Sequence, residues 1–269
     1  MVIINFLIIF IYNIVCMLLV TLIIASLTLI ERKVLSLLQR RVGPNVVGYK
    51  GRLQYIADAL KLFVKGIVVP NGSNKFWFVC IPSIVCAICY TFWLNSMWGS
   101  SISILEFEYN LVYASVLSLI FGYCIMLTGY FSRSKYAFMS SIRTGLAMLN
   151  LELFLGLFLL TLVSLSESFS FVNFVFYQQQ FYFILFYLGV LGLIIIVFLL
   201  ETNRSPFDLS EAESELVAGY SVEYGGFYFA LYYLGEYFHL FFFSMFISLT
   251  LLGGWFNLSN FLFYNLYII

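Results

Sequence analysis

Carboxylic acids inside apolar segments are the chemically unusual feature of this sequence. Glu152, Glu201 and Glu236 each lie within or at the end of a long apolar run, in a chain that is 63% hydrophobic and 10% charged. A carboxyl group in a low-dielectric environment can hold or release a proton near neutral pH. A single buried Glu can equally be a hydrogen-bonded structural group between helices. Three of them on successive apolar segments favour a path for protons or charge.

A second concentration of acids follows the fifth apolar segment, in "ETNRSPFDLSEAESELVAGYSVEYGG" (201–226). This stretch contains one cation, Arg204, and these acids: Glu201, Asp208, Glu211, Glu213, Glu215 and Glu223. Pro206 is expected to end the preceding helix. The run from Ser210 to Glu213 fits a capping box and predicts a short helix that begins near Glu211.

The composition predicts the elements that position these acids. Soluble domains are about a quarter charged, so a chain with 10% charged residues is predicted to be an all-α integral membrane protein with one helical domain. Six segments are long and apolar enough to span a bilayer: roughly 2–30, 77–98, 109–131, 146–166, 181–200 and 225–252. The first is longer than the hydrocarbon core, so we expect it to be strongly tilted. The apolar tail 253–269 is too short to span alone.

The positive charges predict the orientation. All thirteen Lys and Arg residues lie in the connections after the first, third and fifth predicted spans. The positive-inside rule therefore places these connections on the cytoplasmic or matrix side and the N-terminus on the other side. Within the first connection (31–76), apolar residues recur at helical spacing from Arg52 onward. We expect an amphipathic helix there, lying in the membrane interface.

Other motifs carry weaker signals. Cys86 and Cys89 have the spacing of a metal or redox pair, but their apolar neighbours favour two small buried side chains. His239 has no accompanying cluster of metal ligands, which favours an ordinary buried imidazole. No phosphate-binding loop, nucleophile motif or zinc motif occurs, so we expect no metal and no redox cofactor bound by this chain.

Three long stretches resemble one known family. "ERKVLSLLQRRVGPNVVGYKGRLQYIADALKLFVKG" (31–66) resembles the first matrix loop of NADH dehydrogenase subunit 1, a membrane subunit of respiratory complex I that also has bacterial counterparts. "ETNRSPFDLSEAESELVAGYSVEY" (201–224) resembles its acidic fifth loop. "YFSRSKYAFMSSIRTGLAMLNLELFLG" (130–156) is similar, more loosely, to its third loop and fourth helix.

The resemblance implies roles for individual residues. A chamber for the substrate ubiquinone would be lined or shaped by Arg32, Gln39, Arg41, Asp58 and Arg204. An acidic path from quinone reduction to proton translocation would contain Glu152, Glu201, Asp208, Glu211, Glu213, Glu215, Glu223 and Glu236. NADH, FMN and the iron–sulfur clusters would be bound by partner subunits. The family pattern weakens near His239, so the resemblance gives that residue no role.

The resemblance also implies partners and a location. We expect the quinone-reducing subunits of the hydrophilic arm, small membrane subunits toward the antiporter-like arm, and membrane lipid as partners, and no nucleic acid. The location would be the mitochondrial inner membrane, with the N-terminus facing the intermembrane space. The family has two further spans. We expect a separate polypeptide to supply them, next to the apolar end at 261–269.

Two alternatives remain open from the sequence. One is the equivalent subunit of a related, hydrogenase-type proton-pumping complex with another electron donor. The other belongs to a different class, a stand-alone proton or ion channel. The broad basic connection at 31–76 favours docking onto other subunits over a self-sufficient channel.

Overall fold

The computed structural model describes residues 2–94, 108–179, 182–204, 207 and 219–255, and every regular element in this part of the chain is a helix. This confirms the predicted all-α fold class. The α-helices are α1 (Val2–Leu38), α2 (Gln54–Val64), α3 (Lys75–Leu94), α4 (Asn110–Ser132), α5 (Lys135–Ser166), α6 (Phe171–Tyr177), α7 (Phe183–Phe186), α8 (Leu191–Glu201) and α10 (Phe227–Leu251). Two short 3-10 helices are η1 (Tyr49–Gly51) and η2 (Gly219–Ser221).

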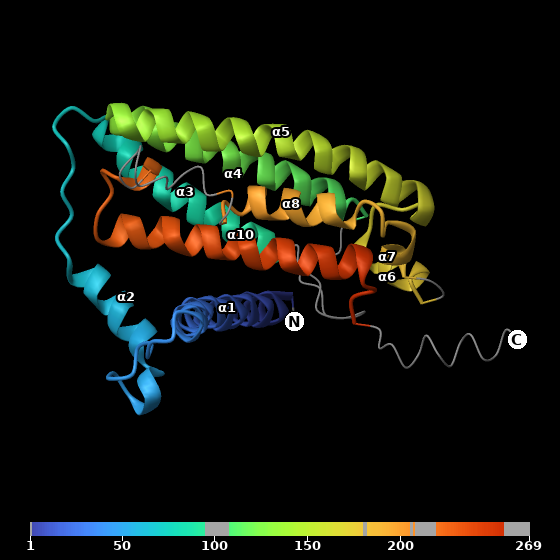
Figure 1. Ribbon diagram of the computed structural model, residues 1–269, viewed down its shortest axis with the longest axis horizontal. Coiled ribbons are helices and arrows are strands. Elements are labelled where there is room, and N and C mark those ends of the chain that lie inside the picture. The colour runs from blue at the N-terminus through green and yellow to red at the C-terminus, as the bar shows by residue number, and fades with distance from the viewer. Residues whose placement is uncertain (1, 95–107, 180–181, 205–206, 208–218, 256–269) are drawn as a thin grey trace, which may run out of the picture.

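Five helices form the bundle that positions the buried acids. α4 packs between α3 and α5, α10 packs against α3, and α8 packs against α5 (Figure 1). Among the described residues, α4, α5, α10 and most of α3 are long and apolar enough to cross a membrane, and α8 is a shorter apolar helix. The chain is therefore a helical membrane protein, and the count of six spans stays a prediction.

The first helix is longer than its apolar run. α1 contains 37 residues, which corresponds to about 56 Å at 1.5 Å per residue. It runs obliquely to the long helices of the bundle and contacts α10 and α2 (Figure 1). The helix continues past residue 30 through the charged sequence Glu31-Arg32-Lys33. The first charged residues of the connection therefore lie on a rigid helix.

α2 is the predicted amphipathic helix, and it ends earlier than the apolar spacing suggested. The pattern extends to Ile67, but the backbone turns to an extended conformation at Lys65. The apolar side chains of Leu60, Phe63 and Val64 are 59%, 63% and 85% exposed. An uncovered apolar side suits a helix that contacts lipid or a partner. Its position in the interface stays a prediction.

Two other segments differ from the sequence-based ranges. The range 146–166 lies inside α5, which begins eleven residues earlier, at Lys135. There α4 and α5 approach closely, since a Cβ atom at Gly129 would lie 2.5 Å from the Ala137 carbonyl oxygen. The range 181–200 is divided between α7 and α8, with Gly189 in the break. Glycine disfavours a continuous helix, and hydropathy does not register such a break.

Candidate functional site: buried acids and two polar clusters

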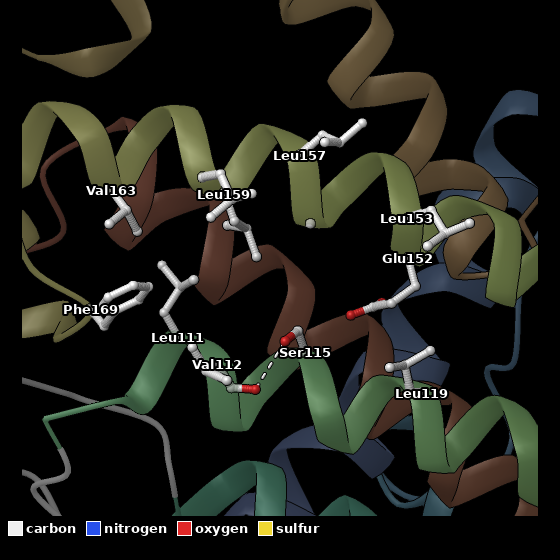
Figure 2. Close-up of a pocket in the computed structure, with 12 residues that line it drawn as sticks. Leu111, Val112, Ser115, Leu119, Glu152, Leu153, Leu157, Leu159, Val163 and Phe169 are labelled. Atoms are coloured by element: carbon white, nitrogen blue, oxygen red, sulfur yellow. Dashed lines mark hydrogen bonds between the residues drawn. The ribbon is translucent and has the colours of Figure 1, made fainter.

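Glu152 is buried in the bundle and accepts a hydrogen bond from a neighbouring helix. It lies on α5 with 7% of its surface exposed, and its Oε2 accepts a hydrogen bond of 2.7 Å from the Ser118 hydroxyl on α4. Its carboxyl points toward Ser115 across a cavity of about 650 Å³ between α4 and α5 (Figure 2). Most of the lining is apolar, and Leu153 and Leu157 on its outer side are 73% and 67% exposed. Glu152 therefore supplies a carboxyl group to a mainly apolar cavity.

A much smaller pocket lies on the inner side of Glu152. It is lined by Ser115, Ser118, Leu155, Leu159 and Glu152 itself, together with Phe242, Phe243 and Phe246 of α10. Its volume is about 10 Å³, at the lower limit of the space that one water molecule needs, so side chains almost fill it. Glu152 thus lies between an open cavity and the aromatic side of α10.

Glu201 is more deeply buried than Glu152. It is the last residue of α8, is 1% exposed, and its Oε2 has no hydrogen-bond partner among the described residues. Its Oε1 lies 3.9 Å from Nε2 of His239 on α10. The carboxyls of Glu152 and Glu201 are close enough to interact electrostatically. The structure therefore brings two of the predicted path residues together, next to a histidine for which the sequence suggested no role.

Glu236 is connected to the segment that follows the acidic loop. It lies on α10 and accepts a hydrogen bond from the hydroxyl of Tyr220 in η2. Tyr224, just after η2, stacks on Phe78 of α3 with ring centroids 4.1 Å apart. Burial raises the pKa of the Tyr224 hydroxyl to about 12. Tyr224 thus stays neutral and anchors η2 on the bundle.

The predicted chamber residues near α2 form two small contacts. Arg32 on α1 donates a 2.5 Å hydrogen bond to Asp58 on α2, and the amide of Gln54 donates to the same carboxylate at 3.0 Å. Just beyond α1, Arg41 donates a 2.7 Å hydrogen bond to the side-chain oxygen of Gln39. Asp58 therefore ties α2 to the end of α1.

Arg204, the fifth predicted chamber residue, belongs to a different group. Its guanidinium donates a hydrogen bond to Glu31 on α1 and lies 4.7 Å from the ring centroid of Tyr237 on α10. The Tyr237 hydroxyl donates to the other oxygen of Glu31 at 2.5 Å. We call these three residues the Glu31 cluster. Glu31 and Tyr237 were not predicted as site residues, and the only signal in the sequence was the position of Glu31 at the end of an apolar run.

Part of the predicted acidic path falls outside the described residues. Asp208, Glu211, Glu213 and Glu215 lie there, as do Pro206 and the predicted short helix near Glu211. Glu223 is described and half-buried.

The cysteine pair lies in the packed interior. Cys86 and Cys89 are both buried on α3, and the Cys89 thiol donates to the Gly235 carbonyl oxygen at 3.4 Å. Within the described part of the chain, no three His, Cys, Asp or Glu side chains group as metal ligands would.

Comparison with known proteins identifies the family. The family model described as NADH dehydrogenase matches residues 11–268. NADH-ubiquinone oxidoreductase chain 1 of Paramecium tetraurelia is 62% identical over 259 residues, which cover 96% of this chain and 99% of that protein. The chain 1 of Chondrus crispus is 38% identical, covering 88% of this chain and 73% of the relative. The chain 1 of Metridium senile is 39% identical, with 86% and 70% covered. The chain therefore belongs to the NADH dehydrogenase family, as a membrane subunit of the kind named chain 1.

Proposed function

We propose that this subunit of the NADH:ubiquinone oxidoreductase complex contributes a ubiquinone chamber and an acidic path that couples quinone reduction to proton translocation. The observation that carries the proposal is the pair of buried carboxyls, Glu152 and Glu201, 7% and 1% exposed inside a helical membrane bundle. Within the described residues, neither forms an ion pair with a Lys or Arg, and the His239 imidazole is the basic group next to Glu201. A buried carboxyl without a fixed cation is suited to exchanging a proton.

The chamber is proposed at the junction of α1, α2 and α10. Polar contacts there (Arg32 with Asp58, and the Glu31 cluster) lie near the uncovered apolar side of α2. Ubiquinone has a polar head and an apolar tail, so it needs polar donors next to an apolar surface. Phe63 on α2 meets Phe227 at the start of α10 with ring centroids 5.3 Å apart, so the apolar side of α2 adjoins the start of α10.

The wider assembly is part of the same proposal. The connections after the odd-numbered spans would face the mitochondrial matrix and the N-terminus the intermembrane space, which agrees with the sorting of cations. The basic connection would dock on the hydrophilic quinone-reducing subunits, which would hold NADH, FMN and the iron–sulfur clusters. Small membrane subunits toward the antiporter-like arm would be further partners.

The test is Glu201→Gln in the assembled complex, with Glu108→Gln as the matched control. Both changes remove one carboxyl group, but Glu108 is exposed and lies outside the bundle. Glu201→Gln is expected to lower NADH-driven proton pumping by about tenfold or more while the complex still assembles. Glu108→Gln is expected to pump normally. Full quinone reduction and full pumping by the Glu201 variant would refute the acidic path.

A further inference from the structure

The strongest unassigned feature is the imidazole of His239, the only histidine in the chain. It is 1% exposed, and its Nε2 has no hydrogen-bond partner among the described residues. Oε1 of Glu201 lies 3.9 Å from that nitrogen, and the other oxygen of the same carboxyl is also unpartnered. A buried nitrogen and a buried oxygen without hydrogen bonds lower the stability of the fold. Their presence here indicates a functional role.

Aromatic rings enclose the imidazole on three sides. Phe121 of α4 stacks on it with ring centroids 4.5 Å apart, Phe243 of α10 meets it at 4.7 Å, and Phe92 of α3 at 5.7 Å. These rings exclude water, and an aromatic face also stabilises a cation lying over it. The enclosure leaves the side toward Glu201 for a polar contact.

Three predicted path residues are related to His239 by contact, charge or helical spacing. Glu201 faces it from α8, and Glu152 of α5 interacts with Glu201. Glu236 precedes His239 by three positions on α10, so both project from the same side of that helix. On α3, the titratable group that contacts α10 is the thiol of Cys89, which donates a hydrogen bond to the carbonyl oxygen of Gly235. His239 thus supplies a base among these acids.

We infer that His239 and Glu201 form a proton-relay pair within the acidic path, an inference that rests on the function proposed above. At rest the apolar surroundings favour an uncharged carboxylic acid and an uncharged imidazole. In the relay step the O–H bond of Glu201 breaks and an N–H bond forms at Nε2 of His239, giving a carboxylate beside an imidazolium. The Nε2–H bond then breaks and an O–H bond forms at a Glu236 carboxylate, which returns the imidazole to its neutral form. Glu201 takes up another proton from the path. The 3.9 Å separation must close by about 1 Å for direct transfer.

Charge on Glu152 would control this step. Glu152 interacts with Glu201, so a negative charge on Glu152 raises the energy of a negative Glu201 and opposes the transfer. The relay can therefore operate when Glu152 holds a proton and is opposed when Glu152 is charged. The protonation of Glu152 would regulate proton transfer without a conformational change.

The experiment compares His239→Gln, His239→Asn and Phe243→Leu in the assembled complex. Gln keeps a polar group near the position of Nε2 and Asn keeps one near the position of Nδ1, but neither amide can hold the extra proton. Phe243→Leu disturbs the same packing and leaves the imidazole in place. We expect both amide variants to lower proton pumping by about tenfold and to change the pH profile of coupled turnover. Phe243→Leu is expected to change pumping and its pH profile far less than the two amide variants, because the imidazole that accepts the proton is still present.

Combination with Glu201→Gln separates the two proposals. The double variant is expected to be no slower than Glu201→Gln alone, because a pair that acts as a unit is lost once. Full pumping and an unchanged profile in both amide variants, with Glu201→Gln impaired, would overturn the relay and leave the acidic path standing. Normal pumping in Glu201→Gln as well would overturn both. Failure of the amide variants to assemble, with Phe243→Leu equally affected, would make His239 a packing residue and also overturn the relay.

Discussion

The polar groups on two sides of α10 differ in burial and in hydrogen bonding. Tyr237 and His239 are two positions apart, which rotates their side chains by about 200° around the helix. On the Tyr237 side, Glu31 has both a cation and a hydroxyl as partners, and it is about one-third exposed. On the His239 side, Glu201 is buried and has one oxygen with no partner among the described residues.

This contrast separates acids that are suited to hold a charge from acids that are suited to exchange a proton. A partly exposed carboxylate with a guanidinium partner is stabilised as an ion. A carboxyl enclosed by apolar side chains, without such a partner, gains little by ionising and can change its proton when a neighbour changes. We therefore assign the Glu31 cluster a fixed, positioning role and the buried acids a changing one.

The largest expected effect comes from neutralising the second buried acid. Glu152→Gln keeps an oxygen that can accept the hydrogen bond from Ser118, so the complex should assemble. It cannot exchange a proton, and we expect NADH-driven pumping to fall by about tenfold or more. Pumping by purified complex in vesicles, followed with a pH-sensitive dye, measures this. Ser118→Ala is the control and should cost far less, since the carboxyl remains. Equal losses in both variants would reduce Glu152 to a structural acid.

Breaking the Glu31 cluster should instead act on stability. Glu31→Gln removes the negative partner of Arg204 and leaves a half-buried guanidinium over the Tyr237 ring. We expect a loss of about 1–3 kcal/mol, seen as earlier thermal unfolding of the complex, with pumping per electron unchanged. Adding Arg204→Gln should restore part of the loss, because the unpaired charge is then gone. A loss of pumping without a loss of stability would show that Glu31 has more than a positioning role, which contradicts the contrast between the two sides of α10.

Hydropathy predicted most of this fold from the sequence. The ranges 109–131 and 225–252 lie close to α4 and α10, because long uncharged runs have few alternatives to a spanning helix. The early start of α5 was missed because its first turns contain serines and Arg143, which lower hydropathy without preventing a helix. The division of 181–200 was missed because a break inside an apolar run leaves hydropathy unchanged.

The contacts of the site could not be predicted in the same way. Glu31 meets Arg204 and Tyr237 across 173 and 206 positions of sequence, and no periodicity links residues so far apart. The pairing of His239 with Glu201 likewise depends on how α8 lies beside α10. The acids stood out in the sequence because charge is rare in an apolar chain. Their partners did not, and the roles assigned to these acids stay proposals.

A smaller effect is expected from the hydroxyl that reaches Glu236. Tyr220→Phe removes a single donor from a half-buried carboxyl and leaves the ring packed against Tyr232. We expect a loss of about 1 kcal/mol in stability and a change of only a few-fold in pumping. Thermal unfolding and vesicle pumping measure the two effects. A loss of pumping as large as that of Glu152→Gln would make Tyr220 part of the proton path. The groups that exchange protons would then include a residue of η2.

The smallest effect should come from the most exposed pair. Arg32 and Asp58 are 49% and 34% exposed, so water and salt screen their attraction. A double-mutant cycle of Arg32→Gln and Asp58→Asn should give a coupling energy of about 0.2–1 kcal/mol, lower still at high salt. Thermal unfolding at two salt concentrations supplies the cycle. A salt-independent coupling of several kcal/mol would mean that this pair is covered in the assembled complex. Arg32 and Asp58 would then hold permanent charges, as the Glu31 cluster does, at the junction of α1 and α2 where the chamber is proposed.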